Sequence, residues 1–154
     1  MDKQKIMVKY TKKVMRRLYD VDVYVFFRDT HHTRRGIFRD EGLAPFSMKD
    51  YARWKKNPKS SITFDEKLYS KDELTGHAWY TIVHEVSHFE EGIESDNNRR
   101  HYHPDKFKAI EELNLRKVDN LRKQFNKEVG LDDNSEVDDR EDTYEEETND
   151  KSKE

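Results

Sequence analysis

The chain has 154 residues, of which 41% are charged and only 32% hydrophobic, a composition that predicts a single domain with a modest core. It contains no cysteine, which excludes disulfide bonds and cysteine-based zinc ribbons. The longest strongly apolar run is VYVFF, far shorter than a membrane-spanning helix requires, so we expect a soluble, cytoplasmic monomer without a membrane partner.

Charge is distributed unevenly along the sequence. Residues 132–154 contain twelve acidic and three basic residues, a net charge of −9, and too few apolar side chains to form a core. Because the whole chain has 33 acidic and 30 basic residues, residues 1–131 retain 21 and 27 of them, a net charge of +6. We therefore expect one domain over 1–131 and a disordered acidic tail over 132–154.

The first part of the chain predicts one helix followed by two strands. Apolar residues recur at helical spacing and predict an amphipathic helix over residues 3–19, whose other faces are rich in lysine and arginine. A basic face of this kind is usually only solvated, and a weak contact surface for nucleic acid is the alternative interpretation. Alternation in VDVYVFF predicts a strand over 21–27, and GIFR predicts a short strand over 36–39 after a polar turn.

The second part predicts a short helix over 47–58, a strand at SSITF and two longer helices. We expect an exposed sheet edge, with the SSITF strand as the candidate, to bind an extended substrate by strand addition. Ser70 and Glu73 form a capping-box pattern that is expected to open the next helix. A last helix is expected from Pro104 to a stop at Gly130, which makes the fold class α+β with a small sheet of about three strands.

The segment HEVSH, residues 84–88, has the pattern His-Glu-x-x-His within a predicted helix. Residues four apart on a helix share one face, so His84 and His88 can direct their imidazole nitrogens at one zinc ion. Glu85 lies beside them, where it can reach a water on the metal rather than the metal itself. This arrangement suits a catalytic zinc site in which Glu85 is the general base.

A catalytic zinc site requires a third protein ligand and one open position. His101 and His103 both follow the helix after a polar loop that is long enough to return the chain to the metal. Residues two apart in an extended segment point in opposite directions, so one of the two is expected to face the ion. Spacing alone does not choose between them.

The residues HEVSH and HPDKF together resemble the SprT-like and WLM-type zinc metallopeptidases. The pattern of those families is His-Glu-x-x-His, a loop, and then His-x-x-x-Phe at the start of a helix. The resemblance implies a minimal zincin-like domain in which His84, His88 and His103 bind Zn²⁺ and Phe107 packs the following helix beside the metal-bearing one. Specific residues match over 84–107 only, and the cysteine-rich ribbon found in many family members is absent here.

The resemblance implies a zinc metalloendopeptidase that hydrolyses protein or peptide substrates, among which DNA-associated proteins are one class. The residue that stabilises the oxyanion is left open among His77, Arg100, His101 and Tyr102. Two alternatives belong to other classes of protein. One is a catalytically silent zincin-like module that binds or regulates a partner. The other is a nucleic-acid-binding protein with structural histidines, which would show salt-dependent affinity that is independent of metal.

Overall fold

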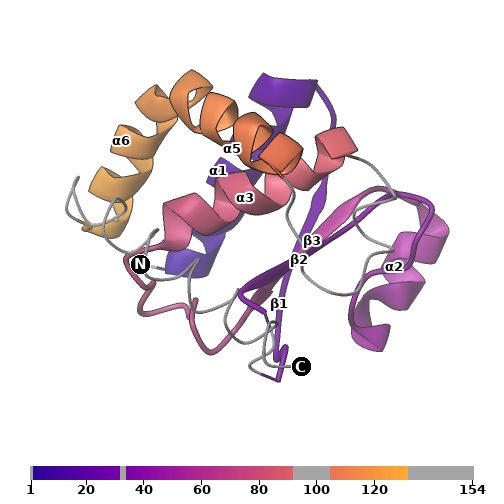
Figure 1. The fold of residues 1–154 in the computed structure, drawn as a ribbon. Coiled ribbons are helices and arrows are strands. Elements are labelled where there is room, and N and C mark those ends of the chain that lie inside the picture. Colours follow the sequence, from indigo (N-terminus) through magenta and orange to yellow (C-terminus); the bar gives the residue numbers. More distant parts are fainter. Residues whose placement is uncertain (1, 32–33, 92–104, 132–154) are drawn as a thin grey trace, which may run out of the picture.

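The computed structural model describes residues 2–31, 34–91 and 105–131, which form an α+β domain of five α-helices and a three-stranded mixed sheet (Figure 1). In chain order the elements are α1 (Lys3–Tyr19), β1 (Tyr24–Arg28), β2 (Gly36–Arg39), the 3-10 helix η1 (Met48–Asp50), α2 (Tyr51–Lys56), β3 (Ser61–Asp65), α3 (Ala78–Glu91), α5 (Asp105–Lys117) and α6 (Asp119–Val129). The expected fold class is confirmed. The expected acidic tail lies outside the described residues.

β3 is the central strand of the sheet, whose order is β1-β3-β2. β1 is parallel to β3, with Val25 opposite Ile62. β2 is antiparallel to β3 on the other side of that strand, with Phe38 opposite Ile62. The prediction that SSITF forms an exposed edge is therefore wrong. The strand is buried along its whole length, which explains its apolar and β-branched side chains.

Both faces of the sheet are covered. Ile62 and Phe64 of β3 pack into the main core with residues of α1 and α3, including Met7 and Trp79. The opposite face is covered by α2, where the guanidinium of Arg53 lies 4.9 Å from the centre of the Tyr24 ring. The main core thus lies between the sheet and the α1–α3 layer.

Helix α3 begins at Ala78, seven residues later than the start at Lys71 that the capping-box pattern at Ser70 predicts. The Ser70 hydroxyl does accept the Glu73 amide at 3.0 Å, but it closes a turn between Tyr69 and Leu74, which form an isolated β-bridge. Tyr69 and Leu74 are both buried, so tertiary packing holds these residues extended. The Ser70–Glu73 hydrogen bond of the capping box is therefore present, but it stabilises a turn and not the start of a helix.

The C-terminal helical region is divided between α5 and α6. A single helix was expected, but the chain leaves helical geometry at Val118, where φ is −111° and ψ is 20°. The break lets α6 pack its buried Leu121 and Phe125 into the core against α1. Gly130 ends α6 in the left-handed conformation with φ of 80°, as its predicted role as a stop requires. None of the helices in the described part of the chain is long and apolar enough to cross a membrane.

Candidate metal centre

Helix α3 brings His84, Glu85 and His88 together on the side that faces β2 and α5. His84 and Glu85 are buried and His88 is partly buried. One potential ligand atom from each residue lies within 4.8 Å of the others, so the three side chains could hold a metal ion. The rings of His84 and His88 lie 5.1 Å apart between centroids and are nearly perpendicular.

Glu85 lies directly against the backbone of β2 at Gly36. A Cβ atom at Gly36 would lie 2.8 Å from Cγ of Glu85 and 3.1 Å from both its Cδ and Oε2. Such contacts are too short for any other residue to be accommodated without displacing the glutamate. Gly36 therefore creates the space in which the Glu85 side chain lies beside the two histidines.

Aromatic rings enclose the two histidines from both neighbouring elements. The Phe107 ring, from the first turn of α5, stacks on His88 with centroids 4.4 Å apart and meets His84 edge-on at 5.2 Å. Phe38 of β2 stacks on His88 from a centroid distance of 6.5 Å. The position of Phe107 agrees with the prediction that it packs α5 beside the metal-bearing helix.

Glu111, one turn after Phe107 on α5, contacts the first histidine of the motif. Its Oε2 lies 2.6 Å from Nδ1 of His84, and both side chains are buried. Tyr80 also donates a hydrogen bond to Glu111. Burial acts to raise the pKa of the Glu111 carboxyl, but the charge of His84 and the hydrogen bonds from His84 and Tyr80 hold that pKa below its ordinary value.

A second polar contact joins α5 to α3. The amide nitrogen of Asn114 donates to the hydroxyl of Ser87 at 3.0 Å and to that of Tyr19, on α1, at 2.9 Å. Tyr19 in turn donates to Glu90 at 2.8 Å. Asn114 and Ser87 are buried, so these bonds fix α5 and α1 relative to α3.

His77, one of the candidates for oxyanion stabilisation, lies in the turn just before α3. Its Nδ1 is 2.9 Å from the Tyr69 hydroxyl and 3.1 Å from the Thr75 hydroxyl. Burial, and secondarily the positive charge of Arg35, lower the pKa of His77 to about 3. The imidazole is therefore neutral at physiological pH, and its contacts hold the turn that leads into α3.

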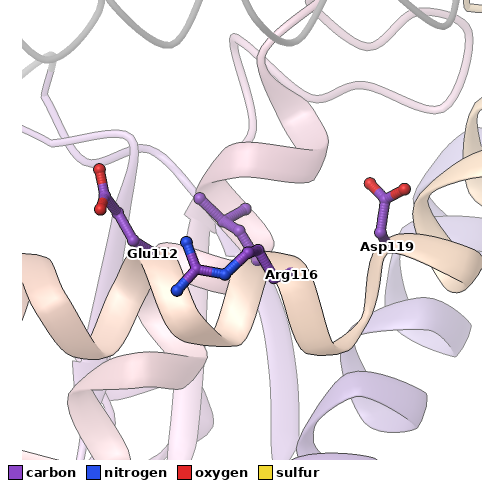
Figure 2. Close-up of a pocket in the computed structure, with 4 residues that line it drawn as sticks. Glu112, Arg116 and Asp119 are labelled. Atoms are coloured by element: carbon purple, nitrogen blue, oxygen red, sulfur yellow. The ribbon is translucent and has the colours of Figure 1, made fainter.

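Figure 2 shows a surface hollow where α5 meets α6. It is lined by Glu112, Leu115, Arg116 and Asp119. None of these residues belongs to the candidate metal group. We assign this hollow no part in the chemistry.

Three of the four predicted site residues, His84, Glu85 and His88, thus lie together. His103, the predicted third ligand, lies outside the described residues, as do Arg100, His101 and Tyr102. Sequence reasoning missed Gly36 and Glu111. The signal for Glu111 was its position four residues after Phe107, on the same face of a predicted helix.

Comparison of the chain with models of protein families, with curated proteins and with solved structures finds no match. The likeness to the SprT-like and WLM-type peptidases therefore remains a prediction from residues 84–107.

Proposed function

We propose that the protein is a zinc-dependent metalloendopeptidase. The observation that carries this proposal is the position of Glu85: it is buried beside two histidines one helical turn apart and lies against a strand that leaves room for it only because residue 36 is glycine. A helix with incidental surface histidines would not bury an ionisable carboxylate at this point, since burial of an uncompensated charge is costly. A general base that serves a metal centre accounts for it.

The charges of the site favour a divalent cation with a neutral third ligand. Glu85 and Glu111 are both buried and together bring two negative charges. A divalent cation would balance them if the remaining ligands are neutral imidazoles, whereas an acidic third ligand would leave an excess buried charge. We therefore propose His84, His88 and His103 as the ligands of the ion.

Glu85 carries the proton transfers in the proposed reaction. Zinc, when bound, supplies Lewis-acid polarisation of the scissile carbonyl and makes water acidic enough to deprotonate near neutral pH. The Glu85 carboxylate accepts the proton of the attacking water and then passes it to the leaving amine nitrogen as the peptide bond breaks. Phe107 helps to hold both histidines, because its ring stacks on His88 and meets His84 edge-on.

β2 is the strand on which we place the substrate. It is an outer strand of the described sheet, and Gly36 at its start contacts Glu85. A peptide added in extended form along this strand would run past the general base. This placement replaces β3, which is paired on both sides.

The test measures zinc content and cleavage of a labelled unstructured protein for the wild type and three variants. We expect about one zinc per wild-type chain, following the usual stoichiometry of a catalytic site. Glu85→Gln should keep the zinc and lose hydrolysis, because the amide cannot accept the proton. His103→Ala should lose or weaken zinc binding, and His101→Ala should retain it.

Glu90→Gln is the matched control, since Glu90 is an exposed glutamate near the end of the same helix and contacts Tyr19. It should keep both zinc and activity. A wild-type protein that neither contains nor takes up zinc would overturn the proposal. Full zinc binding with no hydrolysis of any unstructured protein would favour the catalytically silent module instead.

The nucleic-acid alternative gains little from the basic helix α1. Three of its cations are engaged by acids of the chain itself: Lys9 lies 3.3 Å from Glu128, Lys12 3.5 Å from Asp22, and Arg16 3.3 Å from Asp20. These exposed pairs are weak, but each acid reduces the charge that the helix presents to phosphate.

A further inference from the structure

We propose that Glu111 is a positioning residue that fixes the His84 ring so that its Nε2 atom, and not Nδ1, faces the metal. The proposal rests on the metal-binding part of the proposed function and does not require hydrolysis. It concerns a residue four positions after Phe107, beyond the His-Glu-x-x-His and His-x-x-x-Phe motifs.

The contact between the two side chains assigns the imidazole tautomer. A carboxylate only accepts hydrogen bonds, so Nδ1 of His84, 2.6 Å from Oε2 of Glu111, carries the proton. The lone pair available to a metal is then on Nε2. Without this acceptor, the neutral ring could place its proton on either nitrogen, and one of the two forms cannot bind metal at Nε2.

Glu111 is itself held in place from several directions. Tyr80, one turn before His84 on α3, donates a second hydrogen bond to the carboxylate. Phe107 and Asn114, on either side of Glu111 along α5, contact His88 and Ser87 of α3. Because both helices are fixed around the Glu111 carboxylate, the carboxylate cannot move with the His84 ring. It therefore holds that ring in one orientation.

The same geometry separates Glu111 from the ligands. Among the described residues, the group whose potential ligand atoms lie within 4.8 Å of one another comprises His84, Glu85 and His88, and Glu111 is not part of it. Its role is therefore to act through His84. Loss of such a hydrogen-bond partner typically weakens metal affinity by about 10–100-fold.

The experiment compares the zinc affinities of the wild type, Glu111→Gln, Tyr80→Phe, Glu112→Gln and the ligand variant His88→Ala, measured by competition with a chelator. Glu112 is the next residue on α5 and is exposed, which makes its substitution the matched control. We expect affinity to fall by about 10–100-fold in Glu111→Gln, by less in Tyr80→Phe, and not at all in Glu112→Gln. Circular dichroism confirms that each variant is folded.

A second readout reports the tautomer directly. In zinc-loaded protein labelled with ¹⁵N in its histidines, we expect one strongly deshielded proton on Nδ1 of a ligating ring. That resonance should shift or vanish in Glu111→Gln and persist in Glu112→Gln. A purely structural role for Glu111 would leave it in place.

The possible results separate this inference from the proposed function. Wild-type zinc affinity in Glu111→Gln, with an unchanged Nδ1 resonance, would overturn the inference and leave the peptidase proposal intact. Loss of zinc as complete as in His88→Ala would also overturn it, because Glu111 would then be a ligand. A wild type that binds zinc without hydrolysing peptides would refute the peptidase and leave the role of Glu111 standing. A wild type that binds no zinc would refute both.

Discussion

Gly36 and Glu85 form the residue contact on which the proposed chemistry depends most directly. The glutamate belongs to a helix and the glycine to a strand, and the two meet where β2 begins. The backbone conformation at position 36 does not require glycine. Among the described glycines, Gly130 has a positive φ and Gly36 does not. Steric exclusion of a side chain by Glu85 is therefore the reason for glycine at position 36.

Gly36→Ala should reduce peptide hydrolysis while leaving zinc bound. The added methyl group would lie 2.8 Å from Cγ of Glu85 and must displace the glutamate, because the other side of the contact is strand backbone. A displacement near 1 Å in a catalytic group can cost about 100-fold in rate, so we expect kcat to fall by about 10–100-fold. Steady-state kinetics and zinc content per chain measure the two effects.

Gly42→Ala is the control, since a Cβ atom there would meet nothing within 4 Å. It should retain the wild-type kcat. Equal activity of both alanine variants would show that Glu85 is free to move without loss, and the general-base assignment would then be untenable.

The contact between α3 and α5 is the element-scale feature that organises the site. Phe107, Glu111 and Asn114 follow each other by four and three residues, so they lie along one face of α5. All three contact α3. Phe107 contacts the rings of His84 and His88, Glu111 contacts Nδ1 of His84, and Asn114 contacts the Ser87 hydroxyl. One helix face thus supplies the apolar cover, the carboxylate and the structural bridge.

Asn114→Ala should destabilise the domain without removing a metal-contacting group. The substitution leaves the buried Ser87 hydroxyl without its amide donor and cuts the bridge to Tyr19. An unsatisfied buried polar group costs about 1–3 kcal/mol, so we expect the free energy of unfolding to fall by about that amount. Urea unfolding in excess zinc measures it.

Asn120→Ala provides the comparison, because Asn120 is an exposed asparagine on α6. We expect its unfolding midpoint to match the wild type. An Asn114→Ala midpoint indistinguishable from that of Asn120→Ala would mean that the bridge does not stabilise the packing of α5.

The predicted elements show where local patterns are sufficient and where they fail. The helical spacing of Met7, Tyr10 and Val14 predicted α1 correctly because these residues pack on one side into the core. Ser70 and Val118 were misjudged because tertiary packing decides there: burial of Tyr69 and Leu74 holds a turn, and α6 folds back against α1. A capping motif can stabilise the start of a helix, but long-range contacts decide whether a helix begins there.

At the scale of the whole molecule, the candidate site was predictable as far as it lies on one helix. His84, Glu85 and His88 are linked by the helical repeat alone, so their spacing was sufficient to place them together. Gly36 and Glu111 come from a strand and a helix that meet α3 only in the folded domain. The sequence also did not specify strand order, because apolar alternation does not distinguish a central strand from an edge strand.

The global stability of the domain should depend on pH through His77. Its pKa is lowered to about 3 in the folded state, by burial and by the charge of Arg35, against about 6.5 in the unfolded chain. Above pH 6.5 both states hold a neutral ring. As pH falls below 6.5, only the unfolded chain binds the proton, so the free energy of unfolding decreases, by about 2 kcal/mol between pH 7.5 and 5.

His77→Gln removes this titration, so the difference in stability between wild type and variant should shrink by that amount as pH falls from 7.5 to 5. Asp22, whose pKa is lowered to about 2 mainly by its hydrogen bond from Lys59, titrates below this window in the folded state and is common to both proteins. Other groups common to both proteins likewise cancel in the comparison. Urea unfolding at half-unit pH steps gives the two curves. Parallel curves would show that the folded protein accepts a proton at His77 without cost, which its partly buried position beside Arg35 and Tyr69 argues against.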